Sequence, residues 1–347
     1  MELQLSSNLE SVTNMKITVI GGGAWGTTLS QALSDNKHEV LIREINHNFV
    51  NKINEEHTHP FFDVTIPSTI HATLDLKEAV NYSDIIMICV PTKFIRSVLT
   101  EINELITTPK LFINVSKGIE PDTSYCVSQI VDEVISKEKL KGYVNLSGPS
   151  HAEEMILRKL TALVSASYDE ENAKFVQTLF SNNRYLRVYT SNDVIGVETA
   201  GAIKNAIAIV SGICSGMGLG ENARAFLISR GVLEIVKITE VLGGKTQTAY
   251  GLSGVGDLIV TASSQHSRNF QCGLKIGRGM NVGDAESSIT QTVEGIKTIN
   301  AAYQIGQKYN LDLPIIENAY KIITNELSPK EALDILLNRS LKKEIIL

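Results

Sequence analysis

The chain has 347 residues, of which 43% are hydrophobic and 20% are charged, with a formal net charge of −6 at pH 7. This length favours two domains, and the composition is typical of a globular protein with a sizeable core. The acidic balance argues against general binding to nucleic acids or membrane surfaces, so an anionic ligand would need a local basic pocket.

The first residues, MELQLSSNLESVTN, have no basic segment followed by an apolar stretch, so they predict a flexible leader over 1–14 rather than a signal peptide. No apolar run reaches the length of a membrane span without a charge or a cluster of glycines. The four cysteines lie far apart and form no CxxC motif (Cys89, Cys126, Cys214 and Cys272). This pattern favours free thiols in a reducing compartment, so we expect a cytoplasmic protein without a zinc site.

Short β-rich runs alternate with helical patterns in the first half of the chain. Strands are expected at 15–20, 38–42, 84–90, 111–116, 143–147, 160–166 and 184–190, with a helix over 25–36 and an irregular excursion over 51–67. This alternation predicts an α/β fold, a Rossmann-type doubly wound parallel sheet covered on both faces. After about residue 190 only helical periodicity remains, so we expect a dinucleotide-binding domain over 15–190 and an all-helical substrate and catalytic domain over 191–347.

The first expected strand leads directly into a glycine-rich turn. The segment ITVIGGGAWGTTLSQAL contains Gly21, Gly23 and Gly26 in the spacing GxGxxG, followed by the first expected helix. In this context Gly21 permits the tight turn, Gly23 lets the backbone approach a pyrophosphate, and Gly26 lets the helix pack on the strand. The helix N-terminus then offers unpaired N–H groups to the phosphates, which predicts a bound NAD or NADP.

The end of the second expected strand bears on the choice of cofactor. An acidic residue there binds the ribose 2′-hydroxyl of NAD, whereas an arginine accommodates the 2′-phosphate of NADP. Arg43 and Glu44 stand side by side at this point. The sequence therefore leaves both cofactors open.

Lys204 is the only Lys or Arg between Arg187 and Arg224, in the small and apolar segment VETAGAIKNAIAIVSG. Its helical neighbours at positions 200, 201, 207 and 208 are Ala, Gly, Ile and Ala, none of which can pair with an ammonium group. The group must therefore extend to solvent, lower its pKa, or meet a partner from elsewhere. We weigh an extended lysine at a helix edge against a catalytic lysine that exchanges protons in a cleft.

Three further segments place polar groups in loops. NVSKGIE puts Lys117 just after a strand, where ligands of open α/β sheets bind. NLSGPSHAEEM offers Gly148, Ser150 and backbone N–H groups as a possible anion site. GLSGVGDLIVTASSQHSRNF carries Asp257, which could orient Lys204, and then Ser267-Arg268-Asn269, whose arginine suits a phosphate. Each segment also has an ordinary structural interpretation, as a surface lysine, a turn or a helix cap.

Taken together, these segments resemble the NAD(P)-dependent glycerol-3-phosphate dehydrogenase family. The resemblance runs from about residue 15 to 340, through IGGGAWGT, NVSKGIE, LSGPSHAEE, GAIKNAIAI, GLGENARA, GLSGVGDLIVT, SRN and TVEG. It implies reduction of dihydroxyacetone phosphate to sn-glycerol 3-phosphate, which feeds glycerophospholipid synthesis, and it suggests a homodimer.

The same resemblance implies roles for individual residues. Lys204 matches the proton donor and acceptor, and Lys117 matches a lysine near both cofactor and substrate. The positions that match substrate contacts are Gly148, Ser150, Asp257, Ser267, Arg268 and Asn269. The positions that match cofactor contacts are Ala24, Trp25, Phe94, Ala152, Arg268, Thr292 and Glu294.

These assignments lead to a mechanism that needs no metal. Hydride passes from C4 of the nicotinamide to the C2 carbonyl, Lys204 protonates the alkoxide, Lys117 stabilises its charge, and Asp257 holds Lys204. Arg268 and its neighbours would anchor the phosphate and fix the reacting geometry. Two alternatives are a dehydrogenase of 3-hydroxy acids with the same layout, against which the SRN segment argues, and a non-catalytic NAD(P)-sensing protein.

Overall fold

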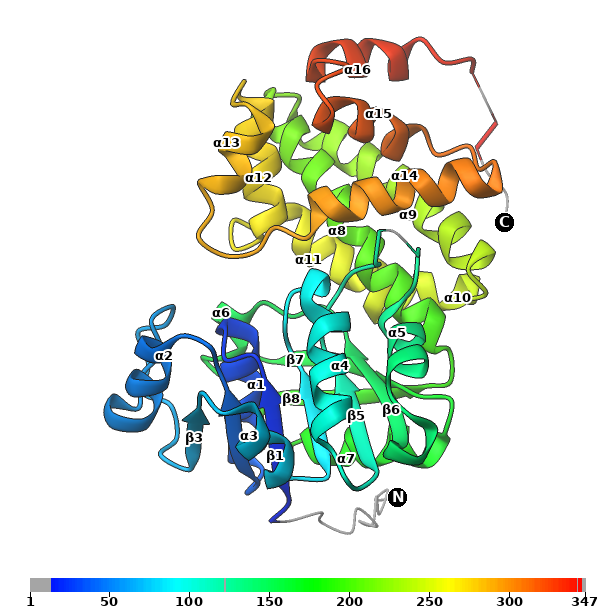
Figure 1. Ribbon diagram of the computed structural model, residues 1–347. Helices are drawn as coiled ribbons and strands as arrows, with labels where there is room; N and C mark the ends of the chain where they lie inside the picture. Colours follow the sequence, from blue (N-terminus) through cyan, green and yellow to red (C-terminus); the bar gives the residue numbers. More distant parts are fainter. Residues whose placement is uncertain (1–13, 122, 342, 345–347) are drawn as a thin grey trace, which may run out of the picture.

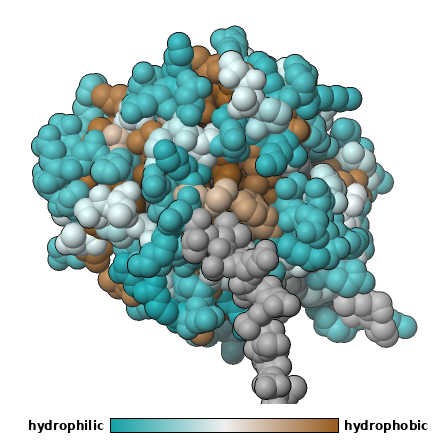
Figure 2. Space-filling model, turned by 90° about the horizontal axis from the view of Figure 1, so that it is seen from below, coloured by the Kyte–Doolittle hydropathy of each residue, from teal (hydrophilic) through white to brown (hydrophobic). Residues whose placement is uncertain are grey.

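The computed structural model describes residues 14–121, 123–341 and 343–344, so the expected leader lies outside the described residues except for Asn14. An eight-stranded sheet with helices forms the N-terminal domain, and helices alone form the domain that follows it (Figure 1). Hydrophilic residues predominate on the face farthest from the helical domain, with apolar ones scattered among them (Figure 2).

The eight strands lie in the order β3-β2-β1-β4-β5-β6-β7-β8. Their bounds are β1 Lys16–Ile20, β2 Glu39–Arg43, β3 Ile70–Thr73, β4 Ile85–Ile88, β5 Lys110–Asn114, β6 Leu140–Ser147, β7 Thr161–Ala166 and β8 Leu186–Ser191. The order reverses between β1 and β4, the point at which Rossmann folds bind their nucleotide. All seven expected strands are present, with shifts of a few residues at their ends.

The expectation of a wholly parallel sheet is wrong at one edge. β6 pairs with β7 in antiparallel fashion, and β8 runs parallel to β7, so the last two strands oppose the others. The connection from β6 to β7 contains only the short helix α6 (Ala152–Met155). A parallel crossover usually carries a helix long enough to return along the sheet, and α6 has only 4 residues, so β7 pairs antiparallel with β6 instead.

Successive residues of a strand point to opposite faces of the sheet, and in these strands the residues on both faces are apolar. Helices therefore cover both faces. Ile17 and Val19 of β1 pack with α1 (Ala24–Asp35) and α7 (Glu170–Phe180). Ile20 and its neighbours pack on the other face, with three helices. These are α3 (Leu76–Tyr82), α4 (Ile95–Leu105) and α5 (Val127–Val134).

The segment between β2 and β3 is more ordered than the sequence suggests. It contains α2 (His47–Asn51), a π-helical turn over Lys52–Glu56, and an isolated bridge between His59 and Phe62. β3 was not expected, because four residues of the type IHAT give too short a pattern to distinguish from a loop. The segment lies beside the start of α1 and therefore beside the glycine turn (Figure 1).

Every element described after β8 is helical. The long helices of this second domain are α8 (Val194–Gly216), α9 (Gly220–Val241), α12 (Arg268–Gly277), α14 (Gly295–Tyr309), α15 (Pro314–Ile323) and α16 (Pro329–Leu337). Its short helices are α10 (Thr246–Ala249), α11 (Asp257–Ser263) and α13 (Val282–Ser287), with a π-helical turn over Leu252–Gly256 before α11.

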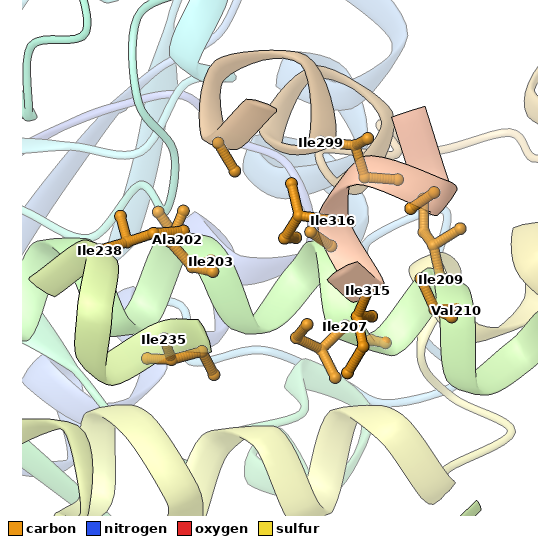
Figure 3. Packing of buried hydrophobic residues seen from close by; sticks show 14 of the residues in the cluster. Ala202, Ile203, Ile207, Ile209, Val210, Ile235, Ile238, Ile299, Ile315 and Ile316 are labelled. Atoms are coloured by element: carbon orange, nitrogen blue, oxygen red, sulfur yellow. The ribbon is translucent and has the colours of Figure 1, made fainter. Parts of the chain in front are cut away.

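Helix α8 is the core of the helical domain. Its apolar residues pack against α9, α14 and α15, and Figure 3 shows Ile207 of α8 beside Ile315 of α15. The helix is long and apolar enough to cross a membrane, but 94% of its apolar stretch is buried inside the protein. A helix that is apolar on all sides is expected in just such a core.

Candidate active site

A cavity of about 830 Å³ lies between the carboxyl ends of the strands and the helical domain. It brings together nearly all the residues singled out from the sequence. They are Gly21, Gly23, Ala24, Trp25, Gly26, Arg43, Phe94, Lys117, Ser150, Ala152, Lys204, Ser267, Arg268, Asn269, Thr292 and Glu294. Gly148 and Asp257 do not line the cavity, but both accept hydrogen bonds from Lys117 behind its wall.

The glycine turn has the geometry that a dinucleotide requires. Gly21 has φ +110°, and a Cβ there would lie 2.4 Å from the carbonyl oxygen of Cys89. A Cβ on Gly26 would lie 2.0 Å from the carbonyl oxygen of Gly21, so helix and turn meet only through glycine. A Cβ on Gly23 would meet nothing within 4 Å, and Gly23 precedes α1 with no side-chain cap. This open cradle at a helix N-terminus fits the pyrophosphate of a dinucleotide.

Arg43 and Glu44 differ in what remains free for a ligand. The Glu44 carboxylate accepts hydrogen bonds from the backbone N–H groups of Gly22 (2.8 Å), Ile45 (2.8 Å) and Asn46 (3.0 Å). Arg43 is the last residue of β2 and lines the cavity, and its Nε is buried without a hydrogen-bond partner. Glu44 also lines the cavity, but three of its roughly four acceptor positions are already used, whereas the Nε of Arg43 has no partner.

Lys204 finds its partner across the helical domain. Its Nζ lies 3.0 Å from Oδ1 of Asp257 and 2.7 Å from Oγ1 of Thr261, both on α11. The other oxygen of Asp257 lies 2.6 Å from Nζ of Lys117, which reaches over from the loop after β5. One carboxylate therefore bridges two ammonium groups that come from the two domains, and the alternative of a lysine extended into solvent is wrong.

The three side chains of this bridge are largely buried, and burial acts together with neighbouring charges on the pKa values of Lys204 and Asp257. The side chains of Asp257, Lys204 and Lys117 are 1%, 6% and 17% exposed. Burial lowers the pKa of Lys204 to about 8, although the Asp257 carboxylate opposes that shift. Burial alone would raise the pKa of Asp257, but the two ammonium groups hold it below its usual value. Lys204 can therefore give and take a proton near neutral pH while Asp257 stays ionised.

The loop after β6 supports Lys117. The carbonyl oxygen of Gly148 accepts hydrogen bonds from Nζ of Lys117 (3.1 Å) and from the hydroxyl of Ser150 (3.0 Å). Gly148 has φ +146°, and a Cβ there would lie 2.8 Å from the carbonyl oxygen of Ala162. Only glycine suits this position, so the carbonyl is held where it orients the lysine.

The Ser267-Arg268-Asn269 segment forms the start of α12. The Ser267 hydroxyl caps the helix by accepting from the N–H of Phe270 (3.2 Å). Asn269 donates to Oδ1 of Asn205 (2.8 Å) and accepts from the N–H of Gly295 (2.9 Å), so its amide is used in joining α8, α12 and α14. Within the described residues Arg268 forms no hydrogen bond or ion pair, and its guanidinium lines the cavity at a helix N-terminus. This arrangement suits a phosphate.

One hydrogen bond and one aromatic side chain close the cavity between the domains. Glu294 accepts a hydrogen bond from the N–H of Thr92 (3.2 Å), in the loop after β4. Phe94 in the same loop is 46% exposed and faces the cavity. The helical domain thus holds the loop that forms one wall of the cavity.

Comparison with known proteins agrees with this geometry. Residues 16–173 match the family model for the N-terminus of NAD-dependent glycerol-3-phosphate dehydrogenase, and residues 193–334 match the model for its C-terminus. The chain belongs to the NAD-dependent glycerol-3-phosphate dehydrogenase family.

Relatives within the dehydrogenase family match this chain over nearly its whole length. A glycerol-3-phosphate dehydrogenase [NAD(P)+] of Acholeplasma laidlawii is 58% identical over 96% of this chain and 100% of the relative. The enzyme of the same name from Staphylococcus haemolyticus is 44% identical over 95% of the chain and 99% of the relative. The crystal structure of glycerol-3-phosphate dehydrogenase from Coxiella burnetii has a TM-score of 0.89 at 31% identity, covering 94% of this chain and 99% of that one.

The structure of this dehydrogenase family member adds residues that the sequence did not point to. Asn205, next to Lys204, lines the cavity and bonds Asn269. Thr261 contacts Lys204, and its place four residues after Asp257 on a helical pattern was a signal that could have found it. His59 contacts the glycine turn from a segment expected to be irregular, and nothing in its sequence context indicates this. In the part of the chain that the structure describes, no cluster of His, Cys, Asp and Glu could hold a metal ion.

Proposed function

We propose that this protein reduces dihydroxyacetone phosphate to sn-glycerol 3-phosphate, in a reversible reaction with a reduced nicotinamide dinucleotide. The observation that carries the proposal is the Lys117–Asp257–Lys204 bridge at the wall of a cavity that starts at a dinucleotide turn. When bound, the cofactor supplies the hydride that reduces the C2 carbonyl.

The protein's own residues supply the remaining chemistry. Lys204 donates its proton to the developing alkoxide, which a group with a pKa of about 8 does readily at neutral pH. Lys117 adds a second positive charge beside the same oxygen, and Asp257 keeps both ammonium groups in place. In the reverse direction neutral Lys204 accepts the proton of the hydroxyl group.

The phosphate of the substrate would bind at the start of α12. Arg268 has a free guanidinium there, and the helix dipole favours an anion. Gly148, Ser150, Ser267 and Asn269 support this binding site by holding Lys117 and the helix start. Binding energy from the phosphate then fixes the carbonyl against the reacting groups.

The cofactor would lie along the rest of the cavity. Gly21, Gly23 and Gly26, with Ala24 and Trp25, would hold the pyrophosphate. Phe94, Ala152, Thr292 and Glu294 line the same cavity as Lys117 and Arg268. Arg43 would meet a 2′-phosphate, because Glu44 is already bonded to three backbone N–H groups. We therefore propose NADPH as the preferred reductant.

The remaining features of the proposal rest on family resemblance. We propose a cytoplasmic homodimer whose product feeds glycerophospholipid synthesis. The four cysteines are free thiols in the structure, which is consistent with a reducing compartment. The boundary between the domains would fall at about residue 190, close to where β8 ends at Ser191 and α8 begins at Val194.

The direct test is oxidation of NADPH and NADH after addition of dihydroxyacetone phosphate, with the wild type and the Lys204→Ala variant. We expect rapid oxidation by the wild type, and a fall in kcat of about 10²- to 10⁴-fold in the variant, because it lacks the proton donor. Cofactor affinity should stay near that of the wild type, measured by quenching of Trp25, the only tryptophan. No oxidation by a folded wild type would lead to trials of 3-hydroxy and 3-keto acids, and substantial turnover by Lys204→Ala would remove Lys204 from the mechanism.

A further inference from the structure

The middle glycine of the turn is held at both of its backbone polar groups. The N–H of Gly22 donates to Oε2 of Glu44 at 2.8 Å. The carbonyl oxygen of Gly22 lies 2.8 Å from Nε2 of His59, which is 2% exposed. Both partners lie on the segment that follows β2, far along the chain from the turn.

The partners of His59 determine which of its nitrogens carries the proton. A carbonyl oxygen can only accept, so Nε2 must donate to Gly22. The N–H of Phe61 can only donate, and it lies 3.3 Å from Nδ1 of His59, so Nδ1 must be unprotonated. His59 is therefore a neutral imidazole that donates on one side and accepts on the other. Burial, which lowers the pKa of His59, favours this neutral form.

The peptide that His59 holds is the one that presents Gly23 to the phosphates. In a trans peptide the C=O and the following N–H point in opposite directions, so fixing the carbonyl of Gly22 also fixes the N–H of Gly23. Gly23 is the position where the space for a pyrophosphate is open. Without His59 this peptide would keep only the longer contact from the Thr27 hydroxyl, at 3.3 Å.

His59 can fix the turn because its own segment is rigidly attached. Phe49 and Phe61 pack against its ring, with centroids 5.1 and 5.3 Å away, and both line the cavity. Asn54 exchanges two hydrogen bonds with the backbone of Ala72 in β3, at 2.8 and 2.9 Å. The segment is thereby anchored to the edge of the sheet.

We propose that His59 is a positioning residue for the dinucleotide, acting through the carbonyl of Gly22 to hold the N–H of Gly23 toward the pyrophosphate. This inference rests on cofactor binding by the proposed dehydrogenase, and it goes beyond the glycine motif itself. It assigns a function to a segment that the sequence describes only as an excursion.

Three variants separate the two contacts of the imidazole. His59→Gln keeps a donor near the position of Nε2 and loses the acceptor for Phe61. His59→Asn keeps an acceptor near the position of Nδ1 and loses the donor to Gly22, and His59→Ala loses both. The matched control is His38→Asn, because His38 is also a buried histidine (3% exposed) but does not line the cavity.

The measurement is the Kd of NADPH and NADH from quenching of Trp25, together with the thermal midpoint and the KM for dihydroxyacetone phosphate. We expect Kd to rise about five- to tenfold in His59→Ala and His59→Asn, as for loss of one hydrogen bond to a buried acceptor. His59→Gln should stay within about twofold of the wild type, and His38→Asn should lower the midpoint without changing Kd. The KM for the ketone should stay close to the wild-type value in all four.

Other outcomes would overturn the proposal in distinguishable ways. An unchanged Kd in His59→Ala would remove the role of His59 while leaving cofactor binding intact. A wild-type Kd in His59→Asn with a raised one in His59→Gln would show that the Phe61 contact, not Gly22, matters. If His38→Asn lost as much affinity as His59→Ala, the rise in Kd would be explained by general destabilisation of the protein and not by the contact with Gly22. If neither nucleotide quenched the wild type, the proposed function itself would fail, and this inference with it.

Discussion

The proposed role of Arg43 in binding the cofactor depends on the hydrogen bonds that its neighbour Glu44 already makes. Glu44 accepts hydrogen bonds from three N–H groups at the end of β2, so its carboxylate keeps about one of its four acceptor positions for a ribose hydroxyl. The guanidinium of Arg43 lines the cavity with its Nε unpaired. The sequence could not separate the two residues, because they are adjacent and both suit a cofactor.

We expect Arg43→Gln to lower kcat/KM for NADPH by about 10- to 100-fold, the usual cost of losing a hydrogen bond to a charged group. The kcat/KM for NADH should change by less than about threefold, because NADH lacks the 2′-phosphate that Arg43 would contact. Steady-state kinetics with both cofactors measures the effect. Arg187→Gln, which changes an exposed arginine packed over Tyr189, is the control and should leave both values unchanged. An equal loss with both cofactors would contradict the assignment.

Asp257 raises the pKa of Lys204, against the larger effect of burial, which lowers it to about 8. In the proposed mechanism, reduction of the ketone requires the ammonium form of Lys204, so activity should fall as pH rises through its pKa of about 8. Asp257→Asn removes the charge that stabilises the ammonium, so the pKa of Lys204 should fall further. The alkaline limb of kcat/KM for reduction should then move to lower pH than in the wild type. Thr261→Val, which removes a neutral partner, should move the limb less, and an unchanged limb in Asp257→Asn would contradict the bridge.

At the scale of elements, a close contact between α8 and α12 positions the site. Gly212 of α8 and Gly273 of α12 face the other helix, where a Cβ would lie 2.2 and 1.9 Å from backbone oxygens. Gly216 and Gly277, one turn further along, face the opposite backbone in the same way. Small residues at this spacing let two helices approach closely. This contact places the start of α12, with Arg268, against the part of α8 that carries Lys204 and Asn205.

We expect Gly273→Ala to force the two helices apart, with a cost of about 1–3 kcal/mol in the free energy of unfolding. The shift would move Arg268, so the KM for dihydroxyacetone phosphate should rise several-fold. Urea unfolding and steady-state kinetics measure these effects. Gly283→Ala is the matched control, because its Cβ would only touch Asn281 at 3.4 Å. A Gly273→Ala variant with normal stability and KM would refute the role of the contact.

At the scale of the whole molecule, two buried carboxyl groups of the helical domain join its helices to other elements. Glu198 of α8 accepts hydrogen bonds from Ser128 and Tyr143 of the N-terminal domain. Glu234 of α9 accepts from the N–H groups of Ile315 and Ile316, at the start of α15. Burial raises the pKa of each to about 7.

These raised pKa values predict an unusual pH dependence of stability. Between about pH 4.5 and 7 the folded state keeps protons that the unfolded state releases. Each group therefore makes the protein more stable as pH falls through this window, and the contribution is lost as pH rises toward 7. In the wild type, Glu234 should make the unfolding free energy fall between pH 5 and 7 by an amount on the order of 2 kcal/mol. We expect Glu234→Gln to lack this part of the fall, so that its slope against pH is flatter. Urea unfolding at several pH values measures the slope, and an identical slope in wild type and variant would contradict the prediction.

The local parts of the fold could be predicted from the sequence, and the parts that depend on long-range contacts could not. The strands, the glycine turn and the long buried helix follow from period-2 and period-3.6 patterns and from glycine spacing, which are local. The reversal of β7 and β8 and the short strand β3 depend on how a connection fits in space, so the pattern gave the wrong direction or no signal. The site residues were found because several motifs of one family stand in order along the chain.

By itself, the sequence determined the family, the two kinds of domain and the polar residues proposed for the reaction. All three can be recognised from the spacing and type of residues along the chain. Only the tertiary structure decided what each of those residues contacts. It gave Lys204 its partner, since Asp257 lies 53 residues away in sequence and 3.0 Å away in space. It showed that Glu44 accepts hydrogen bonds from three backbone N–H groups and that His59 contacts the carbonyl of Gly22 in the glycine turn. Hydrogen bonds and burial are properties of distance in space, and a buried charge takes its pKa from those distances rather than from its neighbours along the chain.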